Sequence, residues 1–371
     1  MPDYRTESCA IEHPEDIKQE WNELQKHADC SYFQSWGWVE TWLSLIAIEL
    51  QPVVVRVWSE NRLVGIGLFV SKDIKRRVVF QSRAMYLNEY PFDGKNMITE
   101  CNGLLLAKDH ESDVYSEVVA YLLQTFKDHD EFCFGAMLES TARFITEQTL
   151  TEDASYIVNE ESVSRYIDLS DFQPGIDSYL ASLSRNRRGQ IRRSIRLYDN
   201  EGSLQIEEAE NVEQALHYLD RLKVLHTDYW RSKGKGGSFS NPLWEKFHRT
   251  LIQKRFESGE IQLLKVSNHQ GEIACIYNFV LNKHVYVVQT GFTQSEDKRL
   301  MPGYVAHSMA VAYNRSKEMR IYDLMHDDVL YKRILCNRVC KLQWLVIQRK
   351  RLKFTAERIA VSLVRFLRGV T

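Results

Sequence analysis

The sequence predicts two consecutive α/β (α+β) domains, and three observations lead to this fold class. The chain has 371 residues, more than the roughly 250–300 residues at which a single hydrophobic core usually stops growing. Strands and amphipathic helices alternate along the whole chain. Nearly the same order of elements occurs in each half without residue-level identity, so the halves share an architecture.

In the first half, residues 15–45 have apolar residues at helical spacing, which predicts helices. Residues 52–58 and 62–70 are β-branched runs joined by the short turn 59–61, a pattern typical of a hairpin. The later elements predicted here are a strand at 76–83, a helix at 114–126 and a buried strand at 131–138.

The second half is predicted to run from a strand at 203–209 to a basic, amphipathic tail. Its helices are expected at 212–230, 241–256, 301–319 and 329–338, and its other strands at 261–267, 272–282, 284–292, 320–325 and 341–350. Residues 171–202 open with Pro174-Gly175 and end on an Asn/Gly breaker, so we interpret them as a linker helix. The predicted domains are therefore 1–170 and 203–371, with 171–202 between them.

Composition excludes several classes of protein. The formal net charge is −2, so no overall field attracts the chain to nucleic acid or to an anionic membrane. The first residues contain no apolar signal-peptide core, and the longest apolar stretch, 43–50, is far short of the roughly 20 residues of a membrane span. We therefore expect a cytoplasmic protein. Seven scattered cysteines indicate reduced thiols, and Cys336 and Cys340 lack a second ligand pair, so no metal is expected.

Five ordered segments carry a resemblance to a known family. They are residues 183–198, 222–252, 271–292, 300–319 and 322–334. Together they resemble the CelD-type acetyltransferases of the GNAT superfamily, a family linked to bacterial polysaccharide biosynthesis and similar to the Fem-type aminoacyltransferases. The resemblance implies two tandem GNAT-like domains, each with a mixed, mostly antiparallel sheet flanked by helices. It also implies transfer of an acyl group from acetyl-CoA or another acyl-CoA to nitrogen or oxygen of a polar acceptor, such as a saccharide or amino-sugar precursor.

The resemblance assigns cofactor contacts to one strand and the turn after it. In GNAT folds a pair of adjacent strands splays so that backbone N–H groups face the thioester, and 284–292, with Gln289 and Gly291, is the candidate strand. Gly291 indicates a bulge or a close backbone approach, or simply the end of the strand. The following turn and helix start suit a pyrophosphate, although basic turns are commonly just solvated. The residues predicted there are Lys298, Arg299, Pro302, Gly303 and Tyr304, with one glycine where the family usually has two.

Four residues are predicted to carry the chemistry. His226 falls in register with the apolar residues of its helix, so it is either a general base or a hydrogen-bonded core histidine. Asp323 ends a strand and Lys332 follows nine residues later, a spacing that suits an acceptor-orienting pair or a structural ion pair. By the resemblance, Tyr331 protonates the leaving thiolate; an ordinary half-buried aromatic is the alternative. Asp327 and Asp328, where the family tends to carry a glycine, are interpreted as helix caps.

Two basic segments of the sequence could bind further partners, a nucleic acid or a membrane. The helix within 171–202 carries six arginines, which could grip the acceptor stem of a charged tRNA or form a solvated face partly paired with glutamates of 207–213. The basic C-terminal helix could lie on an anionic membrane or pack onto the protein. The alternatives to an acyl-CoA enzyme are thus a Fem-like transferase that uses aminoacyl-tRNA, and a non-catalytic binding module.

Overall fold

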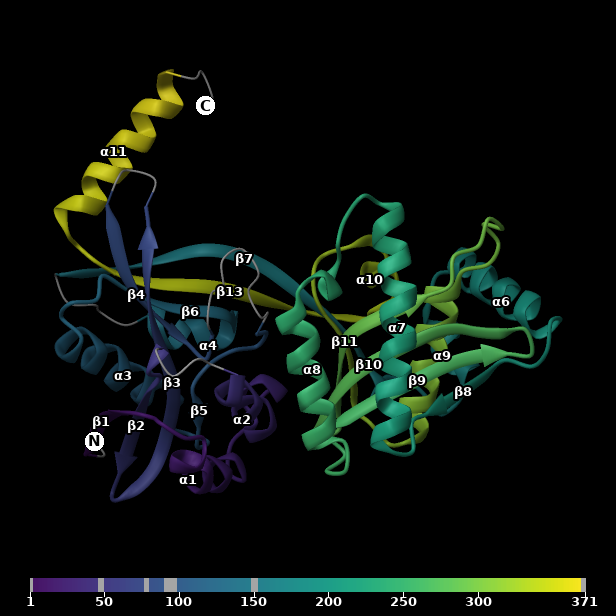
Figure 1. Cartoon of the computed structure of the whole chain (residues 1–371), viewed down its shortest axis with the longest axis horizontal. Coiled ribbons are helices and arrows are strands. Elements are labelled where there is room, and N and C mark those ends of the chain that lie inside the picture. The colour runs from purple at the N-terminus through teal and green to yellow at the C-terminus, as the bar shows by residue number, and fades with distance from the viewer. Residues whose placement is uncertain (1–2, 46–49, 77–79, 90–98, 148–152, 368–371) are drawn as a thin grey trace. The chain divides into compact units, whose positions relative to one another are not determined.

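The computed structural model describes residues 3–45, 50–76, 80–89, 99–147 and 153–367, and it contains two compact units (Figure 1). The first unit comprises residues 1–161 and 341–371, and the second comprises 162–340. These units divide the chain differently from the predicted boundaries. The final strand returns the chain to the first unit, because it pairs there with a strand far away in sequence.

The first unit is a mixed sheet with strand order β1-β2-β3-β4-β6-β13, flanked by helices. The predicted hairpin is confirmed: β2 and β3 pair antiparallel, and Glu60 and Asn61 adopt positive φ angles in the turn between them. Its elements are β1 (Tyr4–Ala10), α1 (Glu15–Gln25), η1 (Tyr32–Gln34), α2 (Trp36–Leu45), β2 (Val53–Ser59), β3 (Arg62–Lys75), β4 (Gln81–Leu87), β5 (Leu105–Leu106), α3 (Glu111–Thr125), β6 (Glu131–Leu138), α4 (Glu139–Thr146), β13 (Arg338–Arg349) and α11 (Leu352–Leu367).

The second unit is also a mixed, mostly antiparallel sheet, with order β7-β12-β11-β10-β9-β8. The predicted helices and strands of this half are all present, with shifted ends, whereas β7 was not predicted. The elements are β7 (Ala154–Asp168), η3 (Leu169–Asp171), α5 (Ile176–Ser182), α6 (Arg185–Asp199), β8 (Gln205–Glu208), α7 (Val212–Ser232), η4 (Ser238–Ser240), α8 (Pro242–Arg255), β9 (Ile261–Asn268), β10 (Gly271–Leu281), β11 (His284–Phe292), α9 (Pro302–Ser316), β12 (Ile321–His326) and α10 (Leu330–Leu335).

Helices cover both faces of the second sheet. Helices α5, α6 and α9 share a hydrophobic core with β9–β12, and the α6 residues Ile191 and Tyr198 are buried in it. The predicted linker helix therefore belongs to the second unit. Helices α7 and α8 lie on the other face, in front of the strands in Figure 1. Each begins with an asparagine cap, and Pro242 opens α8 at a position where its missing N–H costs little.

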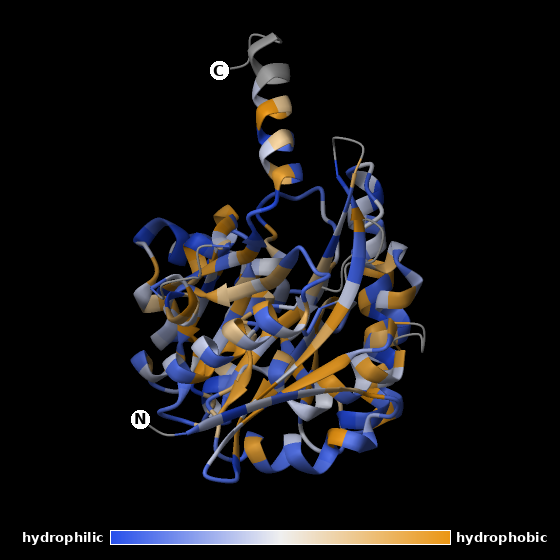
Figure 2. Ribbon diagram, turned by 90° about the vertical axis from the view of Figure 1, so that its left-hand side faces the viewer, coloured by the Kyte–Doolittle hydropathy of each residue, from blue (hydrophilic) through white to orange (hydrophobic). Residues whose placement is uncertain are grey.

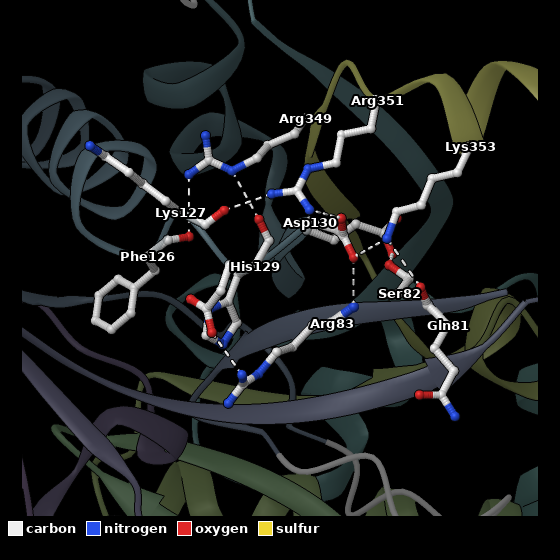
Figure 3. A network of polar contacts seen from close by, with 12 residues as sticks. Gln81, Ser82, Arg83, Phe126, Lys127, His129, Asp130, Arg349, Arg351 and Lys353 are labelled. Atoms are coloured by element: carbon white, nitrogen blue, oxygen red, sulfur yellow. Dashed lines mark hydrogen bonds and ion pairs between the residues drawn. The ribbon is translucent and has the colours of Figure 1, made fainter.

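A polar network fixes the end of β13 to the first unit (Figure 3). Asp130, only 3% exposed on its side chain, accepts the backbone N–H of Arg83 at 2.8 Å and pairs with Arg351 and Lys353 at 2.8 and 2.6 Å. Arg349 donates to the carbonyl oxygens of Leu123, Phe126 and His129, close to the end of α3. Because carbonyls at a helix end lack intrahelical donors, these contacts stabilise both α3 and the return of the chain.

Helix α11 follows this network. Its described turns mix hydrophobic and hydrophilic residues, as Figure 2 shows, and Leu352 and Ile359 are exposed. The amphipathic pattern of the sequence places Leu363, Phe366 and Leu367 on one side of this helix, and these three lie outside the described side chains. Among the described residues, none of the helices is both long and apolar enough to cross a membrane.

Candidate functional site

The parallel strands β11 and β12 pair over a short distance and then diverge. Their ladder runs only from His284 opposite Ile321 to Tyr286 opposite Asp323. Beyond that point β11 continues to Phe292 and β12 to His326. The register of β10 against β11 shifts between Tyr277 and Asn278, which leaves Val288 as a bulge. The two strands are therefore parted at the edge from which the chain leads into α9.

Side chains satisfy backbone groups in the parted segment. On β11, the N–H of Thr290 donates to Oε1 of its neighbour Gln289 at 3.1 Å. On β12, the N–H of Met325 donates to Oδ1 of Asp323 at 2.7 Å, and Lys332 donates to the carbonyl oxygens of Met325 and His326. Buried backbone groups need such partners where a strand ladder ends. A ligand entering between the strands could compete with the side chains for the same groups.

Asp323 and Lys332 both shape the end of β12. The buried Asp323 carboxylate accepts a second hydrogen bond, from Oγ of Ser164 at 3.0 Å, in addition to the one from the Met325 amide. It also lies 3.3 Å from Nε2 of His284. Met325 has a φ of 65°, so the chain turns sharply where Asp323 and Lys332 hold it. The contacts of both predicted residues thus favour their structural interpretation, that of holding the strand end.

An aromatic cluster lies on the α9 side of the parted strands. Its centre is His307, only 1% exposed, whose Nδ1 is 3.1 Å from the hydroxyl of Tyr322 on β12. Phe292 packs edge-on against His307, and Tyr331 stacks on it with centroids 6.0 Å apart. Nε2 of His307 is buried without a hydrogen-bond partner among the described residues. Such an orphaned polar atom is rare and marks a place where a ligand atom or water could bind.

His307 was not among the predicted site residues. It lies four residues after Gly303 inside the expected helix, but a histidine on an apolar helix face is usually a core residue. Its partners come from three other elements, so sequence spacing alone gave no signal.

Tyr331 is placed to keep its proton. Tyr331 is 36% exposed as a residue. The protein packed around its phenol is the main cause that raises the pKa of the group, and the charges of Cys336 and Asp327 add to the effect. The group therefore stays protonated at neutral pH, as a proton donor must. Asp328, expected to cap a helix, instead forms ion pairs with Arg165 and Arg333.

His226 lies on the opposite face of the sheet, in α7. Its Nε2 accepts a hydrogen bond from Nε1 of Trp230 at 2.8 Å, and its Nδ1 is buried without a partner among the described residues. Burial lowers the pKa of His226 to about 4, so the ring is neutral. The structure therefore contains features of both interpretations, a neutral base and a hydrogen-bonded core histidine.

Gly291 faces α7, and Gln289 faces η4. A Cβ on Gly291 would lie 2.8 Å from the carbonyl oxygen of Leu222 in α7, so the close-approach interpretation fits the structure. Gln289 also donates through Nε2 to Oγ of Ser238, at 2.9 Å. These two residues are thus separated from the turn that was predicted to bind pyrophosphate.

That turn is held by α6 as well as by its own residues. Arg299 forms an ion pair with Asp297 of the same turn at 2.7 Å, so its positive charge is partly neutralised within the turn. The side chain of Lys298 is exposed. The N–H of Met301, just before α9, donates to Oγ of Ser194 in α6 at 2.9 Å. Gly303 packs against Phe292, and Arg187 of α6 lies over the ring of Tyr304, 4.8 Å from its centroid. Pro302 opens α9, as predicted.

The arrangement has the features that an acyl-CoA would need. The N–H groups of Thr290 and Met325 in the parted strands bind side chains with which a ligand could compete, and the cluster around His307 contains a nitrogen without a partner among the described residues. The first turn of α9 begins beside Lys298. The residues therefore fit the predicted cofactor in their chemistry. Among the described residues, no group of three or more metal-binding side chains is gathered in one place.

Comparison with known families agrees with this geometry. Residues 185–333 match an acetyltransferase (GNAT) domain. The matched segment begins with α6 and ends in α10, so the GNAT domain contains β11, β12 and α9. No curated protein matches the chain.

Solved structures share the fold of the whole chain. FemX has a TM-score of 0.59 at 10% identity, covering 91% of this chain and 96% of its own. L-PGS from Bacillus licheniformis has a TM-score of 0.52 at 10% identity, covering 93% and 96%. A protein of unknown function from Bacteroides thetaiotaomicron has a TM-score of 0.52 at 11% identity, covering 94% and 100%. At these identities the likeness shows the fold alone, and it confirms the predicted fold class.

Buried histidines in the GNAT domain make its stability depend on pH. Burial lowers the pKa of His248 and of His307 to about 3, and that of His226 to about 4. Since these values lie below the roughly 6.5 of an unfolded histidine, their contribution is complete above that pH and is lost as the pH falls toward 4. We expect the urea midpoint to fall between pH 7.5 and 5.

The variant His248→Gln separates this effect from that of carboxylates. It removes one titrating ring, so its urea midpoint should depend less on pH than that of the wild type. An equally steep dependence in the variant would contradict the assignment to His248.

Proposed function

We propose that the second unit is an acyl-CoA-dependent N- or O-acyltransferase, with acetyl-CoA as the donor. The observation that carries the proposal is the divergence of β11 and β12 beside the start of α9. An acyl transfer needs a polarised thioester carbonyl, and amides in a water-excluded gap between strands can supply that polarisation. The GNAT domain match over residues 185–333 supports the same reaction class.

In the proposed reaction, a nitrogen or oxygen of the acceptor attacks the thioester carbonyl. The N–H of Thr290, released by Gln289, stabilises the developing oxyanion. The carbon–sulfur bond breaks, and the Tyr331 hydroxyl protonates the thiolate. His226 is the proposed acceptor of the nucleophile's proton through Nε2, which requires that the hydrogen bond from Trp230 opens. Asp323 and Lys332 act as positioning residues by holding β12.

The proposed cofactor contacts come from the turn and the start of α9, and separately from Gln289 and Gly291 of β11, on the side of the sheet that faces α7. Lys298, Arg299, Pro302, Gly303 and Tyr304 are the proposed diphosphate contacts. The proposed acceptor is a saccharide or amino-sugar precursor of a cytoplasmic polysaccharide pathway, as the resemblance to CelD-type acetyltransferases implies. The basic helix α11 is a proposed peripheral contact with an anionic membrane.

Calorimetric titration of the full chain with acetyl-CoA tests the donor. We expect micromolar binding, and release of free thiol when amino sugars or saccharides are added. Absence of acetyl-CoA binding would overturn the proposal.

A second candidate is a Fem-like transferase that uses aminoacyl-tRNA, and the arginines of α6 favour it. Binding of tRNA with a steep salt dependence, in the absence of acetyl-CoA binding, would support that candidate. Binding of neither ligand would leave a non-catalytic module.

A further inference from the structure

Helix α6 carries a cationic hollow along its solvent side. The hollow has a volume of about 580 Å³ and is lined by Arg185, Asn186, Gly189, Gln190, Arg193 and Arg196. Volumes of roughly 300–1,000 Å³ are typical of small-molecule sites. We name this feature the α6 groove.

The arginines of α6 fall into two groups. Three have partners: Arg187 lies over Tyr304, Arg188 donates to the carbonyl of Ala181, and Arg192 pairs with Asp177 at 2.7 Å. The side chains of Arg185, Arg193 and Arg196 are exposed, and none makes a hydrogen bond or ion pair with the residues described. Two of the glutamates of 207–213, which were expected as partners, bind other residues: Glu207 pairs with Lys265, and Glu208 accepts a hydrogen bond from Tyr313. The α6 groove is therefore lined by the three α6 arginines that have no ion-pair partner among the described residues.

The α6 groove adjoins the turn that leads into α9. Ser194, next to Arg193, binds the N–H of Met301. The hydrogen bonds from Arg299 are the main cause that lowers the pKa of Asp297 in the turn, and the charge of Arg193 adds to the effect. Arg193 and Arg196 are three residues apart on a helix and project on one side. A ligand whose diphosphate lies at the turn would bring its neighbouring groups to these two arginines.

We propose that Arg193 and Arg196 bind the ribose 3′-phosphate of the acyl-CoA donor. This inference rests on the proposed function and extends it to donor specificity. A terminal phosphate monoester carries up to two negative charges, which matches two adjacent guanidinium groups able to make paired, charge-assisted hydrogen bonds. The site selects coenzyme A thioesters over donors with the same pantetheine arm but no 3′-phosphate.

The test compares binding of acetyl-CoA and of 3′-dephospho-acetyl-CoA to the full chain by calorimetry. We expect the wild type to bind acetyl-CoA about tenfold more tightly, as expected for charge-assisted contacts. The double variant R193Q/R196Q should bind both ligands alike, with the affinity of the dephosphorylated ligand unchanged. The matched control R192Q, whose arginine pairs with Asp177, should keep the preference. Since these side chains are exposed, all variants should melt like the wild type.

Four results would overturn the inference, and they differ in which proposals remain afterwards. Equal binding of both ligands by the wild type, or an unchanged preference in R193Q/R196Q, removes the phosphate site and leaves the acyltransferase proposal intact. Binding of neither ligand by the wild type removes both. If R193Q/R196Q loses affinity for bulk tRNA and keeps its ligand preference, the α6 groove is a nucleic-acid surface instead.

Discussion

Replacement of Tyr331 by phenylalanine is expected to lower kcat for acetyl transfer by about 100-fold, the lower end of typical general-acid contributions. The phenol lies beside the parted strands, and its pKa is held above the usual range. Phenylalanine keeps the ring that stacks on His307 and loses only the hydroxyl. The KM for acetyl-CoA and the melting temperature should therefore change little. Steady-state kinetics with acetyl-CoA and an accepted acceptor measure the effect.

Tyr313→Phe is the matched control. Tyr313 lies in the same domain, on α9, but its hydroxyl donates to Glu208 at 2.8 Å, away from the parted strands. This variant should keep its kcat. A Tyr331→Phe enzyme with wild-type kcat would show that water or another group protonates the thiolate.

Local pattern was sufficient to predict most elements of the second unit. The strands 261–267, 272–282 and 284–292 are β-branched runs separated by short turns, and β9, β10 and β11 follow them closely. By contrast, β7 was missed because much of it is polar, and its exposed residues include Tyr156 and Val158. Strands defined by distant partners leave little local signal.

The domain boundary could not be predicted for the same reason. Strand β13 pairs antiparallel with β6, about 200 residues earlier in the chain, from Leu342 opposite Leu138 to Gln348 opposite Glu131. The anchoring contacts of Arg349, Arg351 and Lys353 likewise join distant segments. The composition of residues 341–350 predicted a strand, but it could not specify which sheet the strand joins.

For the candidate site, the sequence predicted positions better than contacts. Asp323 lies inside β12, at the point where the pairing with β11 ends, and Lys332 folds back toward the end of the same strand. Each binds backbone groups of β12. The partner of His226 is Trp230, four residues later on the same helix, a spacing that was readable in advance. The contacts of His307 could not be predicted from spacing, because Tyr322 and Tyr331 belong to other elements.

The contacts of Asp323 lead to a second large expected effect, on stability. Asp323→Ala should reduce the free energy of unfolding of the GNAT domain by about 3 kcal/mol, because it leaves buried donors on Met325 and Ser164 without an acceptor. The sharp turn at Met325 then loses the contact that fixes it. Urea denaturation measures the loss, and hydrogen exchange of the β12 amides locates it.

Asp323→Asn separates this role from a catalytic one. The amide oxygen can still accept from Met325 and Ser164, so the variant should retain most of the stability, and turnover should follow stability in both variants. A catalytic carboxylate would behave differently: Asp323→Asn would then be stable and inactive. Since Oδ1 already accepts two hydrogen bonds and Oδ2 faces His284, the geometry favours the first outcome. In the proposed reaction, Asp323 is therefore a positioning residue that holds β12 through Met325 and Ser164.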